Sequence, residues 1–202
     1  MTSPPPRPPQ PALHDLDCWP LATERLTLRP PLLKDADAVL GYRALPEVNR
    51  WLGRAITTRQ EAVRCVADPE RSASMVMVEH RGAVIGDLML LVGDGWAQVE
   101  VKESGAGTQA EIGWAFHPAY GGRGLATEAV TALLGVAFGD LRLRRVTAEC
   151  FAANEPSWRL MERLGMRREL HAVADSLHRE LGWLDNLGYA LLREEWLSRG
   201  SA

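Results

Sequence analysis

The chain has 202 residues, of which 46% are hydrophobic and 24% are charged, with a formal net charge of -3 and a pI near 6.0. These values are typical of one globular domain and give no electrostatic reason to bind nucleic acid. Its three cysteines are too few for a disulfide framework or a metal cluster, and no apolar run reaches the roughly 18 residues of a membrane helix. Since the first residues also lack the features of a secretory signal, we expect a cytoplasmic protein with no metal and no membrane partner.

Prolines dominate the first stretch of the chain, with six among residues 1–12. Such a composition favours extended polyproline II conformations, which bury little surface. We therefore predict a flexible tail over residues 1–20 and one folded domain over residues 21–197. Within the tail, Leu16 and Trp19 are expected to pack onto the domain.

Short strands and helices alternate through the predicted domain. Apolar residues recur at every second position in the strands and every three or four positions in the helices. Together they predict an α+β fold with a mixed, mostly antiparallel central sheet of about seven strands flanked by helices. The alternating residues 97–102 are interpreted as a strand extension with a flexible tip. The predicted strands cover residues 24–30, 74–80, 84–92, 110–116, 146–151, 166–173 and 187–192, and the predicted helices cover residues 36–45, 48–52, 59–66, 126–138 and 155–164.

Several of these helices carry recognisable end signals. Asp35 is expected to cap the first helix, and Thr57 or Thr58 precedes Gln60 and Glu61 at the spacing of a capping box. Gly165 follows the last helix as a C-cap. These signals support the predicted boundaries independently of the apolar periodicity.

A glycine-rich turn, Gly-Gly-Arg-Gly at residues 121–124, joins the strand over 110–116 to the helix over 126–138. Its glycines let the backbone turn sharply, and the free N–H groups at the start of the helix suit a phosphate. A plain structural turn is the alternative, since short glycine motifs are common. A P-loop needs a Lys-Ser or Lys-Thr pair where Leu125 and Ala126 stand, and a dinucleotide fingerprint needs a third glycine, so neither fits.

Around this turn the sequence resembles a known family. It is similar to the cofactor motif of the GNAT acyltransferases, and more narrowly to the RimJ/RimL type, which modifies protein N-terminal amines. The family pattern Gln/Arg-x-x-Gly-x-Gly/Ala falls on residues 121–126, with Gly121 in place of the usual Gln or Arg. Because the turn acts mainly through backbone N–H groups, we expect this departure to matter little. The matching run reads Glu111-Ile112-Gly113-Trp114, then His117-Pro118, then Tyr120-Gly121-Gly122-Arg123-Gly124-Leu125-Ala126-Thr127-Glu128-Ala129.

Three further segments resemble the family in the same order. Residues 23–29 are similar to the start of the fold. Asn154-x-x-Ser157, followed by residues 160–166, resembles the family's Asn-x-x-Ser helix ending in Leu-Gly-Phe/Met. Residues 183–196 resemble the C-terminal strand of the RimJ/RimL type. The resemblance thus covers the whole predicted domain.

The resemblance implies a set of acyl-CoA contacts. A backbone N–H from the strand before the turn would hold the thioester carbonyl, with Phe116 and His117 best placed. Asn154 would contact the pantetheine arm, although its position also suits a helix cap. The implied cofactor-binding residues are Phe116, His117, Gly121, Gly122, Arg123, Gly124, Leu125, Ala126, Thr127, Asn154 and Ser157.

Acyl transfer to an amine needs a neutral amine, a polarised carbonyl and a proton for the leaving thiolate. Some relatives use a tyrosine as the proton donor where Met161 stands, so Ser157 is the candidate here, with helix capping as the alternative. For the base, Glu149 is the first candidate and Glu111 the second, and water or another group is left open. Each carboxylate has the alternative role of a solvated or salt-bridged strand residue, and Glu128 is expected to be structural.

The acceptor site is the part that the sequence defines least. The resemblance implies that residues 48–59 cover the acceptor, so Trp51 and Arg54 are the candidate substrate-binding residues. Tryptophans are more often core or interface anchors, which is the alternative for Trp51.

Taken together, these features predict an N-acetyltransferase that transfers an acyl group from acetyl-CoA to a primary amine, by direct attack in a ternary complex. No Cys or Ser has the neighbouring base that a covalent intermediate needs. The acceptor is a protein N-terminus or a small amine. Another acyl-CoA such as succinyl-CoA, and a non-catalytic acyl-CoA-binding module, are the alternatives. We expect acyl-CoA and an amine acceptor as partners and no nucleic acid, and leave a homodimer open.

Overall fold

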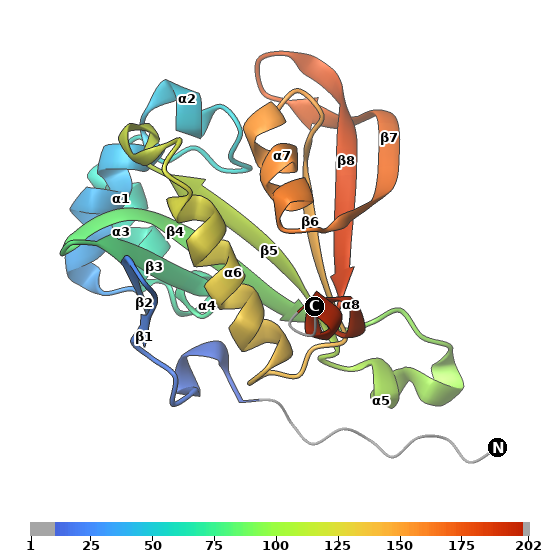
Figure 1. Cartoon of the computed structure of the whole chain (residues 1–202). Coiled ribbons are helices and arrows are strands. Elements are labelled where there is room, and N and C mark those ends of the chain that lie inside the picture. Colours follow the sequence, from blue (N-terminus) through green and yellow to red (C-terminus); the bar gives the residue numbers. More distant parts are fainter. Residues whose placement is uncertain (1–10, 200–202) are drawn as a thin grey trace.

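One mixed sheet organises the chain in the computed structural model, which describes residues 11–199 (Figure 1). Its eight strands follow the order β1-β2-β3-β4-β5-β6-β8-β7. Every neighbouring pair is antiparallel except β5 and β6, which confirms the predicted α+β class. The strands are β1 (Leu21–Ala22), β2 (Leu26–Arg29), β3 (Met75–His80), β4 (Ala83–Gly93), β5 (Gln109–Phe116), β6 (Arg145–Phe151), β7 (Arg167–His178) and β8 (Gly182–Leu192).

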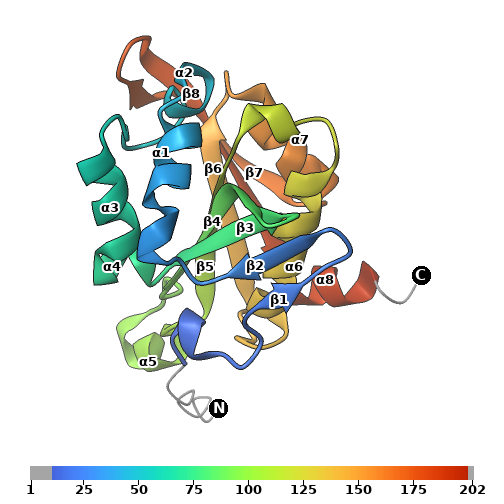
Figure 2. The ribbon, with the colours of Figure 1, turned by 90° about the vertical axis from the view of Figure 1, so that its left-hand side faces the viewer.

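Helices cover both faces of this sheet (Figure 2). Apolar residues of α6 and α7 pack on one face and form the larger hydrophobic core, and those of α1 and α3 pack on the other face. No helix among residues 11–199 is long and apolar enough to cross a membrane. The helices are α1 (Ala36–Arg43), α2 (Pro46–Asn49), α3 (Arg59–Ala67), α4 (Pro69–Ser72), α5 (Lys102–Gly105), α6 (Leu125–Phe138), α7 (Glu155–Arg163) and α8 (Arg193–Ser198).

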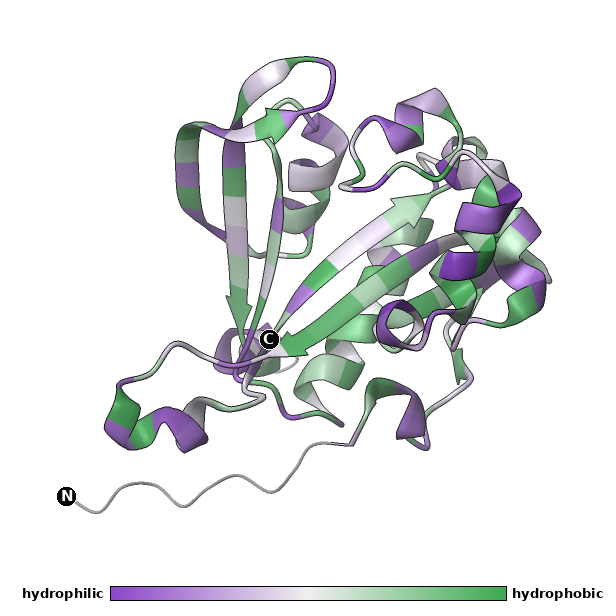
Figure 3. Cartoon of the chain, turned by 180° about the vertical axis from the view of Figure 1, so that it is seen from behind, coloured by the Kyte–Doolittle hydropathy of each residue, from purple (hydrophilic) through white to green (hydrophobic). Residues whose placement is uncertain are grey.

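The sheet opens between β5 and β6, the one parallel pair. These strands pair only at their beginnings, where Gln109 to Glu111 face Arg145 to Thr147. Further on, β5 keeps pairing with β4 as far as Phe116, and β6 keeps pairing with β8 as far as Phe151. The two halves of the sheet therefore diverge, and the opening is seen from behind in Figure 3. This opening leaves the facing edges of both strands free to contact a ligand.

Packed structure begins before residue 21, which we predicted as the start of the domain. Residues Leu13–Asp15 form a short 3-10 helix, and Leu13 is buried in the larger core. Leu16 and Trp19 pack against the same core, as expected, and Trp19 Nε1 donates a hydrogen bond to the Leu13 carbonyl oxygen at 2.6 Å. The proline-rich residues 1–10 lie outside the described residues.

Three of our sequence-based element predictions were wrong. The helix predicted over residues 48–52 is α2 at Pro46–Asn49, and Trp51 lies in the turn beyond it. Residues 97–102 form no strand: a 3-10 turn (Val99–Val101) leads into α5, because the loop closes on itself through Gly95 N–H donating to Gly105 O at 2.7 Å. The final hairpin is also longer than predicted, since β7 continues to His178 and β8 starts at Gly182. The β7–β8 register shifts between Ala172 and Ser176, and this irregularity interrupts the strand alternation on which the sequence-based prediction relied.

The helix-end signals had mixed outcomes. Thr58 and Glu61 form the predicted capping box of α3, and Gly165 adopts a left-handed φ of 64° after α7. The Asp35 side chain does not cap α1. Its carboxylate instead accepts hydrogen bonds from Arg29 Nη1 and from Leu32 N–H, both at 2.7 Å, because a buried charge needs a cationic partner.

Candidate active site

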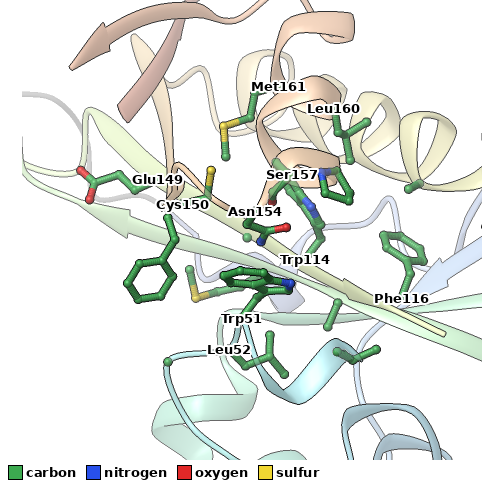
Figure 4. A pocket seen from close by; sticks show the side chains of 18 of the residues that line it. Trp51, Leu52, Trp114, Phe116, Glu149, Cys150, Asn154, Ser157, Leu160 and Met161 are labelled. Carbon is green, nitrogen blue, oxygen red and sulfur yellow. The ribbon is translucent and has the colours of Figure 1, made fainter. Parts of the chain in front are cut away.

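A cavity of about 800 Å³ occupies the opening between β5 and β6 (Figure 4). Its volume lies within the range of small-molecule sites, roughly 300–1,000 Å³. One end is lined by the end of β5, the start of α6 and the start of α7, and the other end by α2 and the segment that follows it. The cavity therefore joins the glycine turn to the predicted acceptor region.

The glycine turn ends at an uncapped helix. Gly122 and Gly124 adopt left-handed φ values of 71° and 76°, a conformation that favours glycine, whereas Gly121 has an ordinary φ of -64°. Gly124 is the N-cap of α6 and has no side chain that could cap the helix. The first hydrogen bond within the helix runs from Glu128 N–H to Gly124 O at 3.0 Å. The first N–H groups of α6 thus have no partner within the helix and suit an anion. Only two of the three predicted glycine positions need glycine for their φ.

Side chains from the start of the domain hold this turn. Arg25 Nη1 donates to the Arg123 carbonyl oxygen at 2.9 Å, and Arg25 Nε donates to Glu128 Oε2 at 2.6 Å. The hydroxyl of Thr23 donates to Glu128 Oε1 at 2.6 Å. Burial would raise the pKa of Glu128, but the hydrogen bonds from Thr23 and Arg25 outweigh it and the pKa is lowered. Glu128 is therefore structural, as predicted, and Arg25 is a supporting residue that the sequence analysis missed.

The end of β5 offers one of its two candidate N–H groups. His117 N–H donates to the Ile85 carbonyl oxygen of β4 at 2.8 Å, so it is already used within the sheet. Since N–H directions alternate along a strand, the Phe116 N–H points toward the opposite edge, where β6 has diverged. The His117 ring is also engaged, because its Nδ1 accepts a hydrogen bond from Ala119 N–H at 3.1 Å. Phe116 is therefore the better placed of the two.

Asn154 and Ser157 line the cavity from the start of α7, and Figure 4 shows their side chains pointing into it. Asn154 is the N-cap of α7, but its side chain makes no cap hydrogen bond. The Asn154 side chain therefore does not cap α7, which was the alternative to its contacting a ligand. Cys150 lines the same part of the cavity, and burial raises the pKa of its thiol to about 11.

The two candidate bases lie on the same face of the sheet, at different depths of the opening. Glu111 stands opposite Thr147 where β5 and β6 still pair, and it is not among the cavity-lining residues. Glu149 lies two positions beyond Thr147 and lines the cavity, where its Oε2 accepts a hydrogen bond from Asn186 Nδ2 at 3.2 Å. Burial, together with the nearby charge of Glu149, raises the pKa of Glu111. Glu149, and not Glu111, lines the same cavity as Asn154 and Ser157, and Figure 4 shows its carboxylate directed away from those two side chains.

The sequence and the fold match a known family. A family model described as an acetyltransferase (GNAT) domain matches residues 25–167. The chain belongs to the GNAT acetyltransferase family. YnaD of Bacillus subtilis, described as an uncharacterized N-acetyltransferase, is 32% identical over 87% of this chain and 98% of its own length. A crystal structure of a GNAT acetyltransferase from Bacillus anthracis has a TM-score of 0.73 and 30% identity, and covers 86% of this chain and 98% of its own.

A second structure shares the fold alone. RimL, a ribosomal-protein alpha-N-acetyltransferase in complex with coenzyme A, is 16% identical with a TM-score of 0.69, over 86% of this chain and 97% of its own. The present chain is thus a GNAT-type N-acetyltransferase, a family whose members use acyl-CoA. Its residues fit that cofactor, because the uncapped N–H groups of α6 suit a pyrophosphate and the cavity leads from them past Asn154 and Ser157.

The acceptor end of this GNAT enzyme is formed by long-range contacts. Trp51 and Arg54, the candidate substrate-binding residues, both line it. The Trp51 ring packs against Phe151 of β6 and His178 of β7, with ring centroids 6.2 Å and 5.6 Å away. Trp51 therefore contacts two segments that lie about 100 residues or more away from it in sequence.

A buried charged cluster borders the same end and was missed by the sequence analysis. Asp87 of β4 is 1% exposed and accepts hydrogen bonds from the Tyr42 hydroxyl and from Arg43 Nε, the latter at 2.8 Å. Burial, with the charge of Asp87, raises the pKa of Tyr42 well above its usual value. An aspartate within the apolar run of β4 was the signal that could have indicated this cluster.

Proposed function

We propose that this enzyme acetylates a primary amine, on a protein N-terminus or a small molecule, by direct transfer from acetyl-CoA in a ternary complex. One observation carries the proposal. Glu149, Asn154 and Ser157 line a single cavity that also reaches the uncapped start of α6. A base, a polar contact and a proton donor therefore border the same cavity.

In this proposal the chain's own groups manage the protons and the developing charge. Glu149 accepts a proton from the acceptor ammonium, directly or through water, so that the neutral amine can attack. The Phe116 N–H donates a hydrogen bond to the thioester oxygen as it becomes negative. As the new C–N bond forms and the C–S bond breaks, the attacking nitrogen loses its surplus proton to solvent water, and the Ser157 hydroxyl gives its proton to the leaving thiolate and takes one back from solvent.

The state of Cys150 supports direct transfer. A thiol with a pKa of about 11 is almost entirely protonated at neutral pH, and the thiolate is the nucleophilic form. Cys150 is therefore a poor candidate for an acyl-enzyme intermediate, although it lines the cavity.

A thiol-release assay with acetyl-CoA and a panel of peptides and small amines tests the proposal. We expect Glu149→Gln to lower kcat/KM about a hundredfold, the usual minimum for a lost general base. Glu111→Gln is the matched control and should change kcat/KM less than threefold. Tight coenzyme A binding by the wild type, with no transfer to any amine in the panel, would instead favour the non-catalytic binding module.

A further inference from the structure

Residues 46–54 are called the acceptor loop. The tip of the β7–β8 hairpin is hydrogen-bonded to this loop (Figure 2). His178 is 3% exposed, and its Nε2 lies 2.9 Å from the Arg50 carbonyl oxygen. Its neighbour Arg179 donates from Nη1 to Asn49 Oδ1 at 2.7 Å and from Nη2 to the Leu52 carbonyl oxygen. Three hydrogen bonds thus join segments that are about 130 residues apart in sequence.

The ring of His178 has one tautomer that satisfies all of its contacts. Its Nδ1 accepts hydrogen bonds from the backbone N–H groups of Glu180 and Leu181, at 3.1 Å and 3.2 Å. Backbone N–H groups can only donate, so the proton lies on Nε2 and is donated to Arg50 O. Both ring nitrogens are therefore used inside the protein, and His178 is not among the cavity-lining residues. His178 therefore has no ring nitrogen left to act as a base or to bind the acceptor.

The residues on either side of this contact form the acceptor end of the cavity. Trp51 and Leu52 of the acceptor loop line it, and Ser176 and Asn186 of the hairpin line it too. The His178 ring packs against the Trp51 ring at 5.6 Å. The hydrogen bonds therefore determine how far apart the loop and the hairpin stand.

The acceptor loop is anchored on the smaller core by Val48 and Leu52, but it has little regular structure of its own. Its one helix, α2, has four residues, and Trp51 lies in a turn beyond it. A loop that is disordered before binding must be ordered by the ligand, which lowers affinity. We propose that His178 and Arg179 are positioning residues that hold the acceptor loop against the hairpin and thereby lower the KM for the amine. The effect on the KM rests on the proposed function, whereas the positioning of the loop does not.

The hairpin itself is shaped for this contact. The pairing of β7 with β8 shifts between Ala172 and Ser176, and Ala174 within this bulge has a left-handed φ of 48°. Asp185 holds the bulge, because its carboxylate accepts hydrogen bonds from Ala174 N–H at 2.9 Å and from His171 Nε2 at 2.7 Å. Bulges bend a strand and redirect its side chains, so this one directs the tip toward the acceptor loop.

Two substitutions of His178 separate its two hydrogen-bonding roles. His178→Asn keeps an acceptor near Nδ1 for the hairpin turn but cannot reach Arg50 O, whereas His178→Gln keeps a donor that can. We expect His178→Asn to raise the acceptor KM about tenfold, the equivalent of one buried hydrogen bond, with kcat and the acetyl-CoA KM within about twofold of wild type. His178→Gln should stay within about threefold of wild type for all three constants. Arg179→Ala should resemble His178→Asn.

Hydrogen exchange of the acceptor loop gives a readout that does not depend on turnover. Exchange over residues 46–54 should be faster in His178→Asn and Arg179→Ala than in the wild type, and close to wild type in His178→Gln. Unchanged exchange in the first two variants would overturn the inference, as would equal changes in the acceptor and acetyl-CoA KM. A wild type that transfers acetyl to no amine would overturn the proposed function, and the exchange result would still decide whether the contact orders the loop.

Discussion

The two ends of the cavity are constructed in different ways. At the acyl-CoA end, the groups that suit the cofactor are backbone N–H groups at the start of α6, presented by a short run of residues around the glycine turn. At the acceptor end, side chains from the acceptor loop, β6 and the β7–β8 hairpin meet through ring contacts and hydrogen bonds. The first end depends on local backbone conformation, and the second on how distant segments pack.

This difference indicates where the enzyme can change without losing its chemistry. Every residue except proline has a backbone N–H group, so we expect the acyl-CoA end to tolerate substitution except where φ requires glycine. Side-chain contacts at the acceptor end change with every substitution. Loops on a rigid scaffold are where specificity commonly varies. We therefore expect acceptor affinity and acyl-CoA affinity to respond to separate sets of substitutions.

The largest effect should come from a side chain at Gly124. A β-branched residue is strained at its φ of 76°, by about 1–2 kcal/mol, and would displace the first N–H groups of α6. We expect Gly124→Val to weaken coenzyme A binding by roughly tenfold to a hundredfold, measured by calorimetry. Gly82 is the matched control, with a φ of 79° and open space around it in the β3–β4 turn. If Gly82→Val weakened coenzyme A binding as much, general destabilisation would explain the effect, and the glycine turn would have no specific role in binding.

An intermediate effect should follow from removing the Trp51 side chain. Its ring covers Phe151 and lines the acceptor end, so truncation removes apolar contact area there. We expect Trp51→Ala to raise the acceptor KM about tenfold and to leave the dissociation constant of coenzyme A within about twofold. Trp96, which is 92% exposed, is the control for loss of a tryptophan and should change neither constant when replaced by alanine. A shift of both constants in Trp51→Ala would mean that the two ends are coupled.

The smallest effect on activity should come from Asp35, which supports the sheet away from the cavity. Its carboxylate pairs with Arg29 at 2.7 Å and is buried. We expect Asp35→Asn to lower the free energy of unfolding by about 1–3 kcal/mol at pH 7, with kcat per folded molecule unchanged. Asp37→Asn, which breaks an exposed pair with Arg59, should cost at most about 1 kcal/mol. Denaturant titration measures both.

The same pair predicts a dependence on pH. Burial alone would raise the pKa of Asp35, but hydrogen bonds from Arg29 and Leu32 outweigh it and the folded-state pKa is lowered. A lowered carboxyl pKa adds stability that is fully present above the unfolded value, near about 4, and is lost as the pH falls through the folded value. The difference between wild type and Asp35→Asn should therefore shrink below pH 4. A difference that stayed constant in acid would show that charge is not what Asp35 contributes.

The sequence by itself determined the features that depend on near neighbours. The α+β class, the turn at residues 121–124 and the capping box of α3 follow from spacing and from the conformational limits of glycine, threonine and glutamate. The Asn154 and Ser157 pair could be placed at the start of α7 for the same reason. Each of these features is set within a few residues of the chain, so no knowledge of the packing was needed.

Only the tertiary structure decided which side chains share the cavity. Strand alternation could place Glu111 and Glu149 on a face, but not show that β5 and β6 separate after Glu111 and leave Glu149 beside the opening. It could not show that His117 N–H is used by Ile85, or that His178 reaches Arg50. These outcomes depend on where a ladder of hydrogen bonds stops and how a bulge bends a hairpin, and both are set by contacts between residues far apart in the chain.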